Sequence, residues 1–266
     1  MPSIICEHRE RTFVVTINRP ERRNAVDLAT ADALFAAFQL FDADDDTDVA
    51  VLTGAGGAFC AGADLKALAG GERWPIMPEG PRAPMGPTRL RLKKPVIAAI
   101  EGPAVAGGLE LALWCDLRIA ARSSVFGVFN RRFGVPLIDL GTIRLPRLIG
   151  QARALDLILT GRAVDAAEAL AIGLVTRTVA DGEALPEALA LASTLSRFPQ
   201  VPMRNDRLSL YEQWDLDEAA AIRNEIERGL TVIRSGEAQA GAAVFAAGSG
   251  RHGETVPNDP AGQTRR

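Results

Sequence analysis

The chain has 266 residues, 47% of them hydrophobic, and its 30 Lys and Arg against 33 Asp and Glu give a formal charge of −3. Both signs are scattered along the chain instead of gathered into basic blocks, which excludes nucleic acid as an expected partner. No basic N-terminal segment leads into an apolar stretch, and no run of about 18 apolar residues occurs, so we expect a cytoplasmic protein without membrane insertion.

Cysteine and histidine usage narrows the chemistry further. Cys6, Cys60 and Cys115 are far apart and form no C-x-x-C pair, and His8 and His252 lie near the chain ends. We therefore expect no disulfide framework, no metal site and no serine–histidine nucleophile. Any chemistry must rest on carboxylates, backbone amides or a cofactor.

The first third of the chain alternates between strand and helix patterns. Residues 4–17 predict a β-hairpin, and apolar spacing over 29–41 predicts a helix. Buried strands are expected at 49–53 and 96–100, each followed by a glycine-rich turn and a helix. Such alternation favours parallel α/β packing.

Three later regions complete the expected organisation. Another strand is predicted at 116–121, and the segment 71–87, with five prolines and three glycines, predicts a surface loop that covers something. After about residue 143 the periodicity is helical, with little strand. We expect three regions: a core over 1–195, a helical C-terminal region over 196–247, and a disordered, polar tail over 248–266.

Several known motifs fail on inspection. The run DADDDTD at 42–48 resembles a calcium loop, but Thr47 and Thr53 stand where that loop needs Gly and Glu. A dinucleotide fingerprint after residue 53 has Phe59 in place of its third glycine, and GPAVAGG at 102–108 lacks the lysine of a phosphate-binding loop.

Glu110 is the residue that most requires an explanation. It lies in the first turn of an otherwise apolar helix within PAVAGGLELALWCD, and a buried carboxylate is costly unless it is paired or used. It could be a helix-start carboxylate favoured by the helix dipole, or an acid/base whose pKa burial raises toward working pH. If the two glycine turns meet, one backbone N–H from each could hold a single oxygen as an oxyanion hole.

Four segments together resemble the enoyl-CoA hydratase/isomerase (crotonase) superfamily. They read NRPERRNAV at 18–26, GAFCAGADLK at 57–66, KKPVIAAIEGPAVAGGLELALWCDLRIAA at 93–121 and LTGRAVDAAEALAIGLV at 159–175, and the resemblance covers residues 4–247. It implies an α/β crotonase (ClpP-like) fold, a spiral of ββα units with a helical C-terminal trimerisation region. It also implies an acyl-CoA thioester as substrate, with coenzyme A entering as part of it and no separate cofactor, and a homotrimer or hexamer.

The resemblance also implies roles for particular residues. The oxyanion-hole amides would be those of Ala63 and Gly107, and Glu110 would be a catalytic glutamate. The coenzyme A path would run along six residues: Arg23, Ala25, Ala61 with its carbonyl at the adenine, Asp64, Leu65, and Lys66 near a phosphate.

The match breaks at the second glutamate of hydratases. Counting twenty residues from Glu110 reaches Asn130, and an amide cannot exchange a proton. Asp139, in a D-x-G-T setting similar to that of dienoyl-CoA isomerases, could supply the second acid/base, or could be a loop Asp that binds backbone amides. Arg131 and Arg132 could neutralise an acidic group on the substrate, although we expect them to be solvated.

Three functions are consistent with this pattern. We expect an enoyl-CoA hydratase-like enzyme that adds water to a 2-enoyl-CoA, with Glu110 as the proton carrier and possible help from Asp139. A double-bond isomerase of the same fold is the alternative enzyme. A catalytically weak acyl-CoA-binding protein is the alternative outside catalysis.

Overall fold

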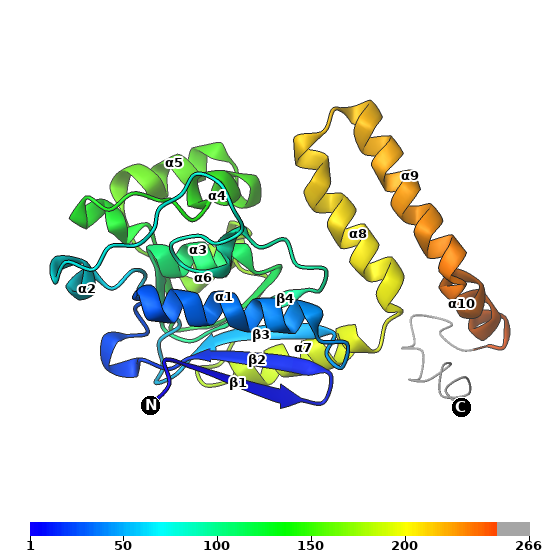
Figure 1. The fold of residues 1–266 in the computed structure, drawn as a ribbon, viewed down its shortest axis with the longest axis horizontal. Helices are drawn as coiled ribbons and strands as arrows, with labels where there is room; N and C mark the ends of the chain where they lie inside the picture. The colour runs from blue at the N-terminus through cyan, green and yellow to red at the C-terminus, as the bar shows by residue number, and fades with distance from the viewer. Residues whose placement is uncertain (249–266) are drawn as a thin grey trace. The chain divides into compact units, whose positions relative to one another are not determined.

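The computed structural model, drawn in Figure 1, describes residues 1–248, and its strands form two β-sheets. The strands are β1 (Ile4–Arg9), β2 (Thr12–Ile17), β3 (Val49–Gly54), β4 (Val96–Ile100), β5 (Pro103–Val105), β6 (Leu117–Ala121), β7 (Val125–Gly127), β8 (Val164–Asp165) and β9 (Arg177–Val179). The larger sheet has the order β1-β2-β3-β4-β6-β9, and the smaller one has the order β5-β7-β8.

Most neighbouring strands are parallel, as expected for strands separated by helices. In the larger sheet only β1 and β2 pair antiparallel, as the predicted hairpin, and all other neighbours are parallel. In the smaller sheet β5 and β7 are parallel, and β7 and β8 are antiparallel. Strands β3 and β4 are almost entirely buried, which explains their continuous apolar sequences.

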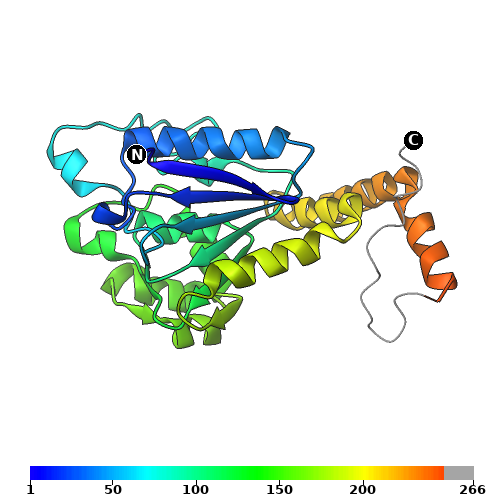
Figure 2. The same cartoon turned by 90° about the horizontal axis from the view of Figure 1, so that it is seen from below.

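The helices lie between the strands along the chain and after the last of them. They are α1 (Leu28–Ala43), α2 (Leu65–Ala69), α3 (Gly107–Trp114), α4 (Gly141–Ile149), α5 (Gln151–Thr160), α6 (Ala166–Ala171), α7 (Ala184–Ser196), α8 (Gln200–Glu212), α9 (Glu218–Ser235) and α10 (Glu237–Ala246), with 3-10 turns η1 (Pro20–Arg22), η2 (Pro87–Arg89), η3 (Phe129–Phe133) and η4 (Gln213–Asp215). Helix α1 packs on β1 and β2, along which it runs in Figure 2. Within residues 1–248 no helix is long and apolar enough to cross a membrane.

The chain divides into two compact units. The first, Met1–Ser193, contains both sheets and one continuous hydrophobic core that α1, β2, β3, β4 and α3 share. The second begins at Thr194, and in it α8 and α9 lie side by side with α10 packed on α9. The tail predicted at 248–266 lies, after Gly248, outside the described residues.

The predicted strands at 49–53, 96–100 and 116–121 are confirmed as β3, β4 and β6, and the helix predicted at 29–41 is α1. Two short strands also interrupt the helical region after residue 143. Strand β9 pairs with β6 and extends the larger sheet, while β8 joins β7. They have three and two residues, which is too short for a period-2 pattern to be visible in the sequence.

Hydrogen bonds join the turn after β3 to strand β5. The N–H of Cys60 donates to the Pro103 carbonyl at 3.0 Å, and the N–H of Val105 donates to the Cys60 carbonyl at 3.1 Å. Helix α3 then begins so close to this turn that a Cβ on Gly108 would lie 2.1 Å from the Cys60 carbonyl oxygen. Glycine at 108 therefore allows the two turns to meet.

Replacing Gly108 by alanine tests this close approach. Gly108→Ala should lower the free energy of unfolding by about 1 to 3 kcal/mol, because the backbone around Cys60 must shift. Gly241→Ala, in α10 (Glu237–Ala246) with nothing within 4 Å of the added Cβ, is the matched control and should be neutral or slightly stabilising. Urea unfolding of both variants measures the difference, and equal midpoints would contradict the packing argument.

Candidate active site

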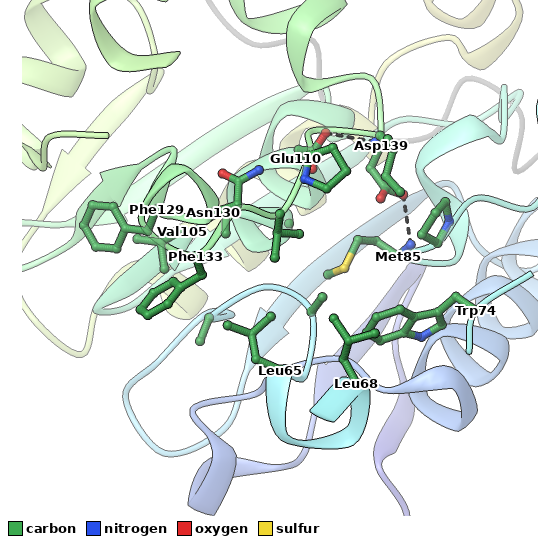
Figure 3. Close-up of a pocket in the computed structure, with 18 of the residues that line it drawn as sticks. Leu65, Leu68, Trp74, Met85, Val105, Glu110, Phe129, Asn130, Phe133 and Asp139 are labelled. Carbon is green, nitrogen blue, oxygen red and sulfur yellow. Dashed lines mark hydrogen bonds between the residues drawn. The ribbon is translucent and has the colours of Figure 1, made fainter. Parts of the chain in front are cut away.

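A cavity of about 480 Å³ lies where the two turns meet. Its lining comes from five segments of the first unit: 61–68, 74–76, 84–85, 105–110 and 129–139. Most of the wall is apolar. Figure 3 shows Glu110, Asn130 and Asp139 on one side of the cavity, and Leu65, Leu68 and Trp74 on the other.

The backbone N–H groups of Ala63 and Gly107 belong to two turns that line the cavity. Ala63 follows Gly62 in the first turn, and Gly107 begins α3 in the second. A Cβ on Gly62 would lie 2.9 Å from the nitrogen of Gly107, so the two turns are in direct contact. Within residues 1–248, neither the N–H of Ala63 nor that of Gly107 donates a hydrogen bond. Two such donors can bind an oxygen that carries negative charge.

Ala106, which precedes α3, holds the second turn in place. Its backbone has a φ of 52°, in the left-handed region that a residue with a Cβ rarely adopts. Its N–H donates to the Gly127 carbonyl at 2.9 Å, and its carbonyl accepts from the N–H of Glu110 at 3.2 Å. The strained residue therefore has hydrogen bonds on both sides, and its conformation starts α3 with Gly107 at the cavity.

Glu110 lies in the first turn of α3 and is only 2% exposed. Its Oε1 accepts hydrogen bonds from the N–H of Asp139 at 2.9 Å and from the N–H of Gly141 at 2.8 Å. A Cβ on Gly141 would lie 2.7 Å from this oxygen, so only glycine allows the contact. The carboxylate is thus held by the start of α4, and its side chain lines the cavity.

Burial, together with the negative charge of Asp139, raises the pKa of Glu110 to about 8, against the opposing effect of the hydrogen bonds from Gly141 and Asp139. The unfolded chain releases this proton near the ordinary pKa of 4.5, so Glu110 costs folding stability as the pH rises from there to about 8. A residue that only stabilised the fold would not carry this cost. A perturbed carboxyl in a cavity is typical of acid/base sites.

Asp139 lines the same cavity and is 2% exposed. Its Oδ1 accepts from the backbone N–H of Met85 at 2.9 Å and from the Thr88 hydroxyl at 2.6 Å. Burial raises the pKa of Asp139, against the opposing effect of these hydrogen bonds and of nearby Arg89 and Arg144. The structure therefore brings Asp139 next to Glu110, and it also makes Asp139 an acceptor for backbone amides.

Asn130 is the third polar side chain of the cavity. It lies in η3, is 4% exposed, and neither its Nδ2 nor its Oδ1 has a hydrogen-bond partner among the described residues. Buried amides are nearly always hydrogen bonded in folded proteins. An unpaired amide at a cavity wall therefore indicates a partner that comes with water or a ligand.

The Asp64 side chain caps helix α2 and pairs with an arginine. Its carboxylate accepts from the N–H groups of Lys66 at 3.0 Å and Ala67 at 3.2 Å, which caps α2, and from Arg19 at 3.0 Å. Burial raises the pKa of Asp64, but the bonds from Ala67 and Arg19 outweigh it and leave the pKa lowered. The side chain is therefore an ionised cap.

The other residues of the expected coenzyme A path lie close together. Ala61 and Leu65 line the cavity, and the N–H of Ala61 donates to the Arg23 carbonyl at 3.0 Å. The Arg23 and Lys66 side chains are exposed, and the Ala25 carbonyl accepts from the Arg19 guanidinium.

The segment 71–87 contributes to the cavity, as the sequence predicted for a covering loop. Trp74 and Ile76 line the wall, together with the end of the loop near Met85. Arg131 and Arg132 are exposed, and both donate to carbonyls of the neighbouring segment 158–161 instead of facing the cavity. Their predicted solvation agrees with this exposure, although they also anchor that turn.

Sequence reasoning missed the residues that support the carboxylates. Met85 and Thr88 bind Asp139, and the Arg144 guanidinium donates to the carbonyls of Thr88 at 2.6 Å and Asp139 at 3.4 Å. Nothing in the local sequence links residues 85–88 to 139, because the contact forms only in the folded chain. The one sequence feature that pointed to this support is Arg144, a cationic residue five positions after Asp139.

Known proteins resemble this chain over nearly its whole length. A family model described as enoyl-CoA hydratase/isomerase matches residues 7–247. The enoyl-CoA hydratase EchA19 of Mycobacterium tuberculosis is 37% identical over 92% of this chain and 94% of its own length. The mevalonyl-coenzyme A hydratase SIDH of Beauveria bassiana is 36% identical over 85% of each chain.

Solved structures agree with these sequence matches. The crystal structure of enoyl-CoA hydratase EchA1 from Mycobacterium marinum superimposes with a TM-score of 0.88 at 38% identity, over 93% of this chain and 96% of that one. An enoyl-CoA hydratase from Mycobacterium tuberculosis gives 0.87 with the same identity and coverage. With the predicted crotonase fold confirmed in this way, the chain belongs to the enoyl-CoA hydratase/isomerase family.

Proposed function

We propose that the protein is an acyl-CoA-processing enzyme that reversibly adds water to the double bond of a 2-enoyl-CoA. The observation that carries the proposal is the combination, on one apolar cavity, of Glu110, buried with a pKa raised to about 8, and the N–H groups of Ala63 and Gly107, which donate to no acceptor within residues 1–248. The relatives named as hydratases support the reaction class. Coenzyme A enters with the substrate, and no separate cofactor is required.

One carboxylate is enough to balance the reaction. Ionised Glu110 takes a proton from water while the water oxygen bonds to C3, and the electrons of the double bond move to the thioester oxygen. The amides of Ala63 and Gly107 stabilise the resulting enolate, because their partial positive charge is already in place. Glu110 then returns the proton to C2, which leaves a 3-hydroxyacyl thioester and the carboxylate regenerated.

In this proposal Asn130, at the position where hydratases carry a second glutamate, orients the water. Its amide oxygen can accept from the water hydrogen that is not transferred, and its amide nitrogen can donate to the oxygen. The unpaired state of both atoms in the folded chain supports this assignment. Asp139 accepts hydrogen bonds from the Met85 N–H and the Thr88 hydroxyl, and its charge helps to keep the pKa of Glu110 high.

For the coenzyme A moiety we propose the path along six residues: Arg23, Ala25, Ala61, Asp64, Leu65 and Lys66. The exposed cations Arg23 and Lys66 suit phosphate groups, and Leu65 lies on the cavity wall. Asp64 contributes by capping α2, the helix from which Leu65 and Lys66 project.

We also propose that the chain forms a homotrimer, or a hexamer of two trimers, through its C-terminal helices. Along α9 four apolar residues at helical spacing are exposed: Ile222, Ile226, Leu230 and Ile233. Such a stripe on an isolated chain is typical of a surface that another protein covers.

The isomerase alternative rests on a single observation, the second buried carboxyl beside Glu110. Two carboxyls at one cavity could remove a proton from one carbon and deliver a proton to another. Asp139 lines the cavity and its pKa is raised by burial, which suits a proton carrier. The substrate series below separates the two reactions.

Glu110→Gln tests the hydration proposal. Loss of enoyl-thioester absorbance over a chain-length series of trans-2-enoyl-CoAs should be measured for the native protein and the variant. We expect turnover of the native protein and a loss of at least about 100-fold in Glu110→Gln, since Gln cannot carry the proton. Absent native turnover, with acyl-CoA bound, would reject hydration, and conversion of 3-enoyl or dienoyl thioesters would then identify an isomerase.

Asn130→Glu separates an enzyme from a catalytically weak acyl-CoA binder. In the proposed mechanism Asn130 only orients water, so the variant should gain no more than about tenfold in kcat/KM. A hydratase that appears only in Asn130→Glu, from a native protein without turnover, would favour the weak binder. The same absorbance assay reads both outcomes.

The pH profile provides an independent test of Glu110. Because the ionised form takes the proton from water, kcat/KM should rise with pH through a midpoint of about 8, the pKa to which burial raises Glu110. At pH values more than about 1 unit below this midpoint, activity should fall about tenfold for each pH unit, because the ionised fraction of Glu110 falls by that factor. A flat profile between pH 6 and 9 would contradict the assignment of Glu110 as the base.

A further inference from the structure

We infer that Arg144 is a positioning residue, which holds the Glu110–Asp139 carboxyl pair in its reactive geometry and charge state. This inference rests on the proposed function, and it names a residue that does not touch the substrate. Arg144 is half-buried in α4 and is absent from the cavity wall. Its effect on the reaction must therefore pass through the residues that it binds.

Arg144 joins two segments that support the carboxylates. One arm of the guanidinium donates to the Thr88 carbonyl at 2.6 Å, and another donates to the Asp139 carbonyl at 3.4 Å. Thr88 in turn donates its hydroxyl to the Asp139 carboxylate at 2.6 Å. The planar, forked guanidinium can reach both carbonyls at once, whereas the single ammonium of lysine has no such fork.

The same contact fixes the hydrogen bonds to Glu110. Asp139 and Gly141, whose N–H groups hold the Glu110 carboxylate, are the residues on either side of Leu140, which has a φ of 68°. This left-handed conformation is unfavourable for a residue with a Cβ and needs support from its surroundings. Arg144 anchors the carbonyl immediately before this residue, and its own N–H donates to the Leu140 carbonyl at 2.8 Å.

Arg144 also provides positive charge where two acids are buried together. Among the described residues, the charged groups that act on the Glu110 carboxyl include Asp139 and Arg144, and those near Asp139 include Glu110, Arg89 and Arg144. The charge of Arg144 lowers the pKa of both carboxyl groups, and it acts on the buried Cys115 thiol in the same direction. Arg89, which binds the Met77 carbonyl, acts on Asp139.

Arg144→Met, Arg144→Lys and the control Arg147→Met test the inference through the pH profile. Removing the cation in Arg144→Met should move the midpoint of the kcat/KM pH profile to higher pH by about 1 unit, because the Glu110 carboxylate loses a stabilising positive charge. Arg144→Lys should keep the midpoint within a few tenths of a unit while kcat falls about tenfold, because the charge remains and the fork is lost. The control Arg147→Met, at an exposed position of the same helix, should leave both the midpoint and kcat unchanged.

Infrared titration of the protonated carboxyl band, assigned with Glu110→Gln, reads the same shift without turnover. A shifted band in Arg144→Met together with an inactive native protein would reject the proposed hydration and retain the role of Arg144. The inference would be overturned if neither the kcat/KM pH profile nor the carboxyl band shifted in Arg144→Met. It would also be overturned if Arg147→Met shifted them equally. If Arg144→Met fails to fold, Arg144→Lys with a midpoint displaced as far as about 1 pH unit would overturn it.

Discussion

Backbone hydrogen bonds between Cys60 and strand β5 bring two separate turns of the chain into contact. The N–H and the carbonyl of Cys60 are both used, with Pro103 and Val105 as partners. These bonds leave no room for a side chain at Gly62 or Gly108, where a Cβ would meet backbone atoms at 2.9 and 2.1 Å. Because of this contact, Ala63 of the first turn and Gly107 of the second line the same cavity.

The buried carboxyl groups depend on a second, more distant set of contacts. Glu110 extends from α3, but the amides that hold it belong to the start of α4, and Asp139 is held in turn by the segment 85–88. Two acids in one apolar wall raise each other's cost of ionisation, which burial already makes high. The supporting donors come from two parts of the chain, 85–88 and 139–141, which lie far from Glu110 in the sequence.

Much of the fold could be predicted from the sequence, since the buried strands β3 and β4 have continuous apolar residues and α1 has clear helical spacing. The short strands β8 and β9 could not, because two or three residues carry no measurable period. Resemblance pointed to the residues that line the cavity, including Ala63, Gly107 and Glu110. It gave no indication that Asp64 caps α2 and pairs with Arg19.

The sequence by itself narrowed the possible chemistry: with two histidines near the chain ends and three widely spaced cysteines, any reaction had to rest on carboxylates, backbone amides or a cofactor. It also determined where glycine leaves space for close approach. The tertiary structure decided which groups meet, through contacts such as Thr88 with Asp139 and Arg144 with the Thr88 carbonyl. The physical reason is that local patterns record the burial and conformation of each segment, whereas hydrogen bonds between residues about fifty positions apart form only when the segments pack.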